Sequence, residues 1–123
     1  IVDQMIDALD LRADDVLLDI CCGNGALSTR FFEKCAGGLG VDYSETLIDV
    51  ARKYFAAKPS VIYRVGDART YLSGESDAAR FTKAIIYGSI SYFPRSEAEA
   101  LLAVTRQRFA NCPSSEVLSS LSA

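Results

Sequence analysis

The sequence from residue 16 reads Val16-Leu17-Leu18-Asp19-Ile20-Cys21-Cys22-Gly23-Asn24-Gly25, an apolar run followed by a loop with two glycines. A short apolar run that is bounded by acidic residues and glycines is typical of a buried parallel strand. Glycines between a strand and a helix let the backbone pass close to a ligand, and the first N–H groups of the helix point toward that ligand. The stretch therefore predicts a nucleotide-cofactor loop, with a simple tight turn between strand and helix as the alternative.

Helical and strand patterns alternate along the rest of the chain. The spacing of apolar residues predicts helices over residues 1–10 and 26–35, a third that Ser44 caps, and a fourth that opens with the capping box Ser96-x-x-Glu99. Gly37-Gly38 is expected to stop the second helix. Buried strands are expected at residues 16–20, 39–41, 61–65 and 83–87, followed by a poor fifth strand or a frayed tail. This alternation predicts an α/β fold with a three-layer, doubly wound and mostly parallel sheet.

Length and composition favour one domain that binds a small molecule. The chain has 123 residues, half of them hydrophobic, which suits a single domain over residues 1–123. Its formal charge of −3 provides no electrostatic footprint for nucleic acid or for an anionic membrane. Because no apolar run approaches the roughly 18 residues of a membrane span and the first residues lack the order of a signal peptide, we expect a cytoplasmic protein.

The cysteines do not indicate a metal site. Four are present, at positions 21, 22, 35 and 112, without a C-x-x-C spacing, and the chain has no histidine that would complete a zinc site. In a cytosolic protein such cysteines are expected to be free thiols that pack as small apolar residues.

Three acidic residues follow the expected strands where ligands bind to this kind of fold. Asp19, Asp42 and Asp67 each lie at or just past the carboxyl end of a strand. A carboxylate accepts hydrogen bonds through two oxygens and suits a ribose diol, an ammonium group or an exocyclic amine. It repels a pyrophosphate, so the three residues predict a cofactor with polar hydroxyl and amino groups.

These motifs, in this order, resemble those of the class I S-adenosylmethionine-dependent methyltransferases. Residues 16–25 resemble the first motif of the family, an acidic residue followed by a glycine-rich loop. Gly40-Val41-Asp42-Tyr43-Ser44 resembles the second motif and Gly66-Asp67-Ala68 the third. Ala84-Ile85-Ile86-Tyr87-Gly88 lies where the family has its fourth strand and the residues beneath the methyl donor. The resemblance implies a Rossmann-like methyltransferase core.

The resemblance also implies a set of cofactor-binding residues. Asp19 and the backbone of Cys21, Gly23 and Gly25 would hold the methionine end of S-adenosylmethionine, within a loop that includes Cys22 and Asn24. Asp42 would bind both ribose hydroxyls, Tyr43 would lie against the adenine ring, and Asp67 and the Ala68 N–H would bind the adenine edge. Tyr87 would lie beneath the methyl donor. A helix-capping role for Asp42 and a turn role for Gly66-Asp67 are the alternatives.

Cys21 departs from the family pattern, which more often has glycine there. A cysteine has a Cβ atom, so the loop must either keep a negative φ at Cys21 or accept strain. Its side chain is expected to point into the sheet while the backbone faces the ligand.

The reaction that the resemblance implies is methyl transfer by in-line displacement, for which alignment of the reactants matters more than a dedicated base. We identify no catalytic residue. After the fourth strand the sequence is neither of the Asn-Pro-Pro-Tyr type associated with amino-group methylation nor a Pro-Cys pair for cytosine. A small-molecule acceptor is therefore expected, with Tyr92-Phe93 either facing the methyl group or packing in the core.

The chain is shorter than a full domain of this family, whose sheet continues past the fifth strand. We therefore expect a sheet that is incomplete at its C-terminal edge, self-association through that exposed edge, and weak cofactor binding by this chain alone.

Two other functions fit parts of the sequence. An NAD(P)-dependent oxidoreductase would also have a glycine loop followed by an acidic residue such as Asp42. Ser28 at the third glycine position and the carboxylate of Asp19 oppose this reading. The second alternative is a non-catalytic cofactor-binding or interaction module.

Overall fold

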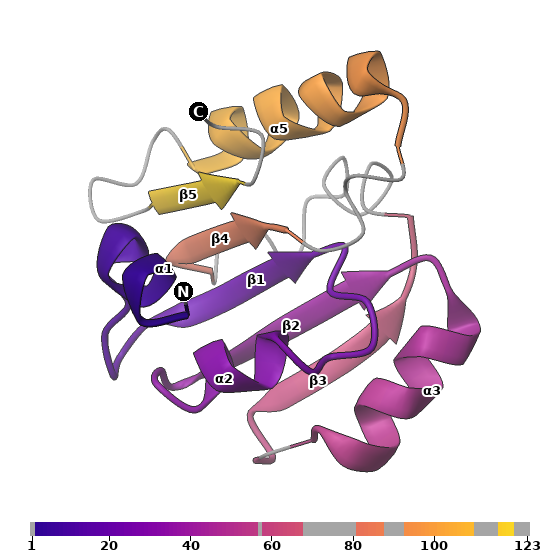
Figure 1. Cartoon of the computed structure of the whole chain (residues 1–123). Helices are drawn as coiled ribbons and strands as arrows, with labels where there is room; N and C mark the ends of the chain where they lie inside the picture. The colour runs from indigo at the N-terminus through magenta and orange to yellow at the C-terminus, as the bar shows by residue number, and fades with distance from the viewer. Residues whose placement is uncertain (1, 57, 68–80, 88–92, 110–115, 120–123) are drawn as a thin grey trace.

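Five parallel strands form one sheet in the computed structural model, which describes residues 2–56, 58–67, 81–87, 93–109 and 116–119 (Figure 1). The order across the sheet is β3-β2-β1-β4-β5. The strands are β1 (Val16–Ile20), β2 (Gly37–Asp42), β3 (Val61–Val65), β4 (Lys83–Ile86) and β5 (Glu116–Ser119). Every adjacent pair is parallel. The predicted doubly wound α/β sheet is confirmed, and the weak fifth pattern does form a strand.

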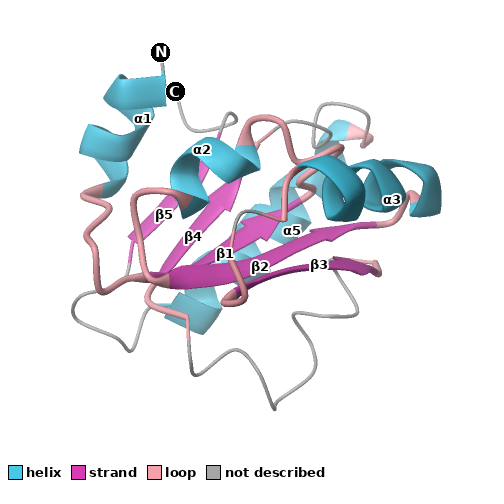
Figure 2. Ribbon diagram, turned by 90° about the horizontal axis from the view of Figure 1, so that it is seen from below, coloured by secondary structure: helices cyan, strands magenta, loops and turns pink. Residues whose placement is uncertain are grey.

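Helices cover both faces of this sheet. One face carries α1 (Val2–Leu9), α2 (Ser28–Phe32) and α3 (Glu45–Tyr54), which lie on the same side in Figure 2. The other face carries α5 (Arg95–Phe109), whose Ala98, Leu101 and Leu102 pack on β1, β2 and β4. The result is the expected three-layer arrangement.

The residues of β1 show why the sheet needs both helix layers. Leu18 and Ile20 point into the cluster beneath α5, while Leu17 points into the cluster beneath α1 and α2. All three are buried, because alternate side chains of a strand lie on opposite faces. A strand that is buried on both faces reads as a continuous apolar run, as this one does.

Gly37 and Gly38 do not stop the second helix, as the sequence had suggested, but begin β2. Helix α2 ends at Phe32, where the bonds from Lys34 N–H to Phe31 and from Cys35 N–H to Phe32 tighten the last turn. At Gly38 a Cβ atom would lie 1.9 Å from the carbonyl oxygen of Leu17. Glycine is thus required there by the close approach of two strands.

Two helix starts test the capping predictions. Ser44 caps α3 as predicted, since its hydroxyl accepts a hydrogen bond from the Leu47 N–H over 3.3 Å. The capping box at Ser96 is wrong, because α5 already begins at Arg95 and the Ala98 N–H bonds to the carbonyl of Pro94. Glu99 instead pairs with the Arg95 guanidinium over 2.9 Å.

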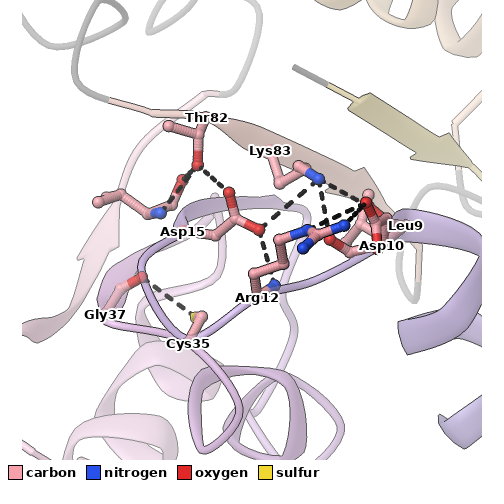
Figure 3. A network of polar contacts seen from close by, with 9 residues as sticks. Leu9, Asp10, Arg12, Asp15, Cys35, Gly37, Thr82 and Lys83 are labelled. Atoms are coloured by element: carbon pink, nitrogen blue, oxygen red, sulfur yellow. Dashed lines mark hydrogen bonds and ion pairs between the residues drawn. The ribbon is translucent and has the colours of Figure 1, made fainter. Parts of the chain in front are cut away.

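A buried polar network joins α1 to the amino-terminal ends of β1 and β4 (Figure 3). The Lys83 ammonium donates to the carbonyls of Leu9 and Asp10 over 3.1 and 2.9 Å and lies 3.6 Å from Oδ2 of Asp15. The Asp15 carboxylate accepts from the Thr82 hydroxyl and from the Arg12 N–H. The network lies at the amino-terminal ends of the strands, whereas the glycine loop follows the carboxyl end of β1.

Within the described ranges, no helix has both the length and the apolar character to cross a membrane.

Candidate functional site

The predicted loop lies at the point where the strand order reverses. From β1 the chain builds outward to β2 and β3 on one side and then to β4 and β5 on the other. In open parallel sheets this reversal leaves a crevice at the carboxyl ends of the strands, where ligands bind. Residues 21–25 connect β1 to α2 at that position.

The backbone of this loop turns sharply. Cys21, Gly23 and Gly25 all have positive φ angles, of 63°, 62° and 83°. At Gly25 a Cβ atom would lie 2.9 Å from the Cβ of Ala51 and 3.3 Å from the Tyr63 ring, so the loop packs closely on α3 and β3. A Cβ at Gly23 would meet no atom of the described residues within 4 Å. The loop is therefore tight behind Gly25 and open in front of Gly23.

Cys21 has the strained backbone, the second of the two possibilities that the sequence left open. Its φ is positive, although it carries a Cβ atom, and its side chain is buried in the cluster on the α5 face. Cys22 is buried in the cluster on the opposite face. Both are free thiols, and burial raises the pKa of Cys22. They pack as small apolar residues, as expected.

Because of this strain, we expect Cys21→Gly to be more stable than Cys21→Ala by about 1 kcal/mol, since a left-handed conformation costs an L-residue about that much. Both variants lose the same thiol, so their difference isolates the backbone term. Urea unfolding of the two proteins measures it. A more stable alanine variant, the usual order inside strands and helices, would show that the loop is unstrained.

Asp42 connects the loop to the start of α3. Its Oδ1 accepts from the Gly23 N–H over 3.2 Å, and its Oδ2 accepts from the Ser44 N–H over 3.0 Å. Only 2% of the residue is exposed. The capping alternative is therefore part of its role, because one oxygen binds next to the cap of α3, while the other holds the glycine loop.

Asp19 is buried beneath the same loop, with 4% of its surface exposed. Its Oδ2 accepts a short hydrogen bond from the Ser28 hydroxyl. Burial raises the pKa of Asp19 to about 7; the Ser28 hydrogen bond lowers it and the nearby Asp42 carboxylate raises it. Carboxyl groups with a raised pKa are common at sites where ligands bind.

A small cavity of about 30 Å³ lies next to Asp19. Its walls come from β1, the loop, α2 and the end of β4, and they include Asp19, Cys22, Ser28 and Tyr87. This volume suits a small group such as water or an ammonium, not a whole cofactor.

Two aromatic rings, those of Tyr43 and Phe93, contact each other after the end of β2. Tyr43 follows β2 and is 61% exposed, and its ring makes an edge-to-face contact with Phe93, with centroids 6.5 Å apart. Phe93 also packs against the core cluster on the α5 face. An exposed ring that is held by a second ring offers a flat surface for a ligand.

The other predicted residues lie around this centre. The Gly66 N–H bonds to the Asp42 carbonyl over 2.9 Å, so Asp67 follows directly where β2 and β3 end. Asn24 is exposed, and its side chain accepts from the Ala26 N–H, which gives it a turn role. Tyr87 is half-buried and directly follows β4, which ends at Ile86, one residue before the predicted end of that strand. Ala68 and Tyr92 lie outside the described residues.

Ser28 is the residue that sequence reasoning missed. The sequence marked it only as a departure from a dehydrogenase loop, but the structure buries its hydroxyl on Asp19. The signal that could have found it is its place in the first turn of the helix, nine residues after the acidic residue. Among the described residues no group of three or more His, Cys, Asp or Glu side chains is placed to hold a metal ion.

Comparison with known proteins identifies one family model that matches most of the chain. The model is a methyltransferase domain, and it matches residues 17–110. Ribosomal RNA small subunit methyltransferase A from Geobacter metallireducens is 33% identical over 64 residues, which are 52% of this chain and 23% of that protein. The chain thus spans about a quarter of the length of that relative.

Solved structures share the fold. Precorrin 8W decarboxylase from Methanobacterium thermoautotrophicum has a TM-score of 0.75 and 16% identity, with 96% of this chain and 60% of that chain covered. An RNA methyltransferase from Salinibacter ruber, solved in complex with S-adenosylhomocysteine, has a TM-score of 0.67 and 24% identity, with 87% and 66% covered.

Proposed function

Because this chain belongs to the methyltransferase-domain family, whose model matches residues 17–110, we propose that it binds S-adenosylmethionine and transfers its methyl group to a small-molecule acceptor. The observation that carries the proposal is the convergence of two buried carboxylates, Asp19 and Asp42, on one glycine loop. An NAD(P)-dependent oxidoreductase is disfavoured by the family match and by a carboxylate beneath a loop that would have to receive a pyrophosphate.

The described residues fit this cofactor at both of its polar ends. Asp42, whose carboxylate also accepts from the Gly23 and Ser44 N–H groups, binds the ribose hydroxyls, because a carboxylate oxygen can accept more than one hydrogen bond. Asp19, buried beside a cavity of about 30 Å³, binds the ammonium of the methionine end. The open space in front of Gly23 leaves room for the ligand against the backbone. We assign Asp67 and Ala68 to the adenine edge.

Aromatic residues complete the site. The Tyr43 ring, which Phe93 supports, stacks against the adenine, and Tyr87 forms part of the floor beneath the reacting group. When bound, S-adenosylmethionine supplies a methyl group that is activated by the sulfonium charge. The chain contributes by holding and aligning the reactants, which accounts for much of the rate without a dedicated base.

A small-molecule acceptor is supported by the charge of the chain. A formal charge of −3 opposes the phosphate contacts on which nucleic-acid binding depends. RNA is the second candidate acceptor, and the similarity to a ribosomal RNA methyltransferase over 64 residues favours it.

The proposed function is tested by calorimetric titration with S-adenosylhomocysteine and, in parallel, with NADH. We expect heat of binding with the first ligand only. Transfer of labelled methyl groups is then measured into pools of small metabolites and into total RNA, and we expect label in the metabolites. Binding of NADH alone would favour the oxidoreductase, label in RNA would move the acceptor to nucleic acid, and binding without any transfer would favour a non-catalytic module.

A further inference from the structure

Asp19 has one carboxylate oxygen that no described residue satisfies. Oδ2 accepts from Ser28, whereas Oδ1 receives no hydrogen bond from any described residue. The side chain is more than nine-tenths buried and lines the cavity of about 30 Å³. A buried carboxylate oxygen without a donor is costly, so it is stabilised either by a proton or by a donor that enters the cavity.

The described groups around Asp19 supply no positive charge that would pair with its carboxylate. The titratable side chains around it in the described part of the chain are Asp42 on β2, Cys21 and Cys22 in the loop, Tyr63 on β3 and Tyr87 after β4. The residue of β4 in register with it is the apolar Ile85, and α2 contributes the hydroxyl of Ser28. Asp42 is itself a carboxylate, and it opposes a second negative charge nearby.

Ser28 is placed to control the orientation of this carboxyl group. Its hydroxyl is buried, donates to Oδ2 of Asp19 and lies 3.5 Å from the carbonyl oxygen of Cys22. Both residues line the cavity, so the bond to Oδ2 fixes the carboxyl group at the cavity wall. It also favours the charged form of the carboxyl group, because a hydroxyl donor stabilises an anion more than a neutral acid.

We propose that Ser28 is a positioning residue for Asp19 and that Asp19 exchanges its proton for the ammonium group of the ligand, so that binding releases a proton. This inference rests on the proposed function. In the free protein the carboxyl group carries a proton for part of the time. When an ammonium enters the cavity, the O–H bond of Asp19 breaks, the proton passes to the solvent, and the carboxylate pairs with the ammonium, which keeps its own protons.

The sign of the pH dependence follows from this exchange. A neighbouring cation lowers the pKa of Asp19 in the complex below its value of about 7 in the free protein. Protons are therefore released between these two values, and affinity rises with pH until it levels above pH 7. Proton release should therefore be large well below the pKa of the free protein and should fall toward zero as the pH rises above it.

The wild-type protein provides the first test. S-adenosylhomocysteine is titrated calorimetrically in two buffers of different ionisation enthalpy, and the difference in heat counts the protons released. 5′-Methylthioadenosine, which shares the nucleoside but lacks the ammonium, is the matched control ligand. We expect proton release with the first ligand and none with the second. Binding of S-adenosylhomocysteine without proton release, or equal release with both ligands, overturns the inference.

Variants at Ser28 provide the second test. Ser28→Ala removes the donor, so the pKa of Asp19 rises further and affinity for S-adenosylhomocysteine falls about five-fold at pH 7 but returns toward the wild-type value at pH 9. Ser28→Thr keeps the hydroxyl and should restore the wild-type pH profile. An equal loss at every pH would mean that Ser28 has only a structural role.

The two levels of the proposal fail in different ways. If S-adenosylhomocysteine does not bind at any pH, the proposed function is wrong and the inference falls with it. If it binds with an affinity that does not change between pH 6 and 8, the proposed function stands and only the proton exchange is wrong.

Discussion

Replacement of Lys83 by methionine is expected to lower the free energy of unfolding by about 3–5 kcal/mol, because it leaves the Asp15 carboxylate without its cation in a buried setting. Lys83 is 4% exposed and Asp15 is 7% exposed. The ammonium also bonds to the carbonyls of Leu9, the last residue of α1, and of Asp10, so its removal leaves two acceptors without their donor. A loss of this size is a large part of the total stability of a small domain.

Urea unfolding of Lys83→Met measures this effect, and Arg95→Met serves as the matched control. Arg95 forms an exposed ion pair with Glu99 over 2.9 Å, and breaking such a pair costs about 0–1 kcal/mol. The double variant Asp15→Asn, Lys83→Met should recover part of the loss, since it no longer leaves a buried charge unpaired. If Lys83→Met and Arg95→Met lower the free energy of unfolding equally, the buried network contributes no more to stability than the exposed pair.

Replacement of Asp42 by asparagine is expected to weaken binding of S-adenosylhomocysteine by about 10- to 150-fold, which corresponds to about 1.5–3 kcal/mol for the loss of a charged hydrogen-bond partner. The asparagine retains one acceptor oxygen for the Gly23 or Ser44 N–H, so the loop keeps part of its support. The loss of charge also removes one of the causes that raise the pKa of Asp19. The pH midpoint of binding should therefore move to lower pH in this variant.

Ser44→Ala is the matched control for Asp42→Asn. It removes the hydroxyl that caps α3 and should cost about 1 kcal/mol of stability, but it leaves the Ser44 N–H on Asp42 and the cofactor affinity unchanged. Calorimetric titration at pH 8, with circular dichroism to verify folding, compares the two variants. If folded Asp42→Asn binds as tightly as the wild type, Asp42 is a capping residue and not part of the cofactor site.

The polar groups at the two ends of the strands differ in how fully they are hydrogen-bonded. At the amino-terminal edge, Lys83, Asp15 and Thr82 satisfy one another and the end of α1. At the carboxyl-terminal edge, Asp19 retains an oxygen that no described residue satisfies. Buried polar groups are normally paired within a protein, so the open oxygen of Asp19 is consistent with the proposed binding of a ligand.

The positions of most residues around the glycine loop could be predicted from the sequence because they follow strands directly. The ends of parallel strands meet at one edge of the sheet, so the positions of Asp19, Asp42 and Asp67 in the chain were enough to bring them together. The contact of Ser28 with Asp19 could not be predicted in this way, since it depends on the rotation of a helix of five residues. The strand position of Gly37 and Gly38 was missed because two glycines after a helix have the same appearance as a stop signal.

The sequence by itself determined the parallel sheet, the glycine loop after its central strand and the row of carboxylates. These depend on apolar periodicity and on the order of short motifs, which act over a few residues at a time. Only the tertiary structure decided the left-handed conformation of Cys21, the pairing of Lys83 with Asp15, and the raised pKa of Asp19. The physical reason is that strain, ion pairing and desolvation depend on which distant segments surround a group and exclude water from it.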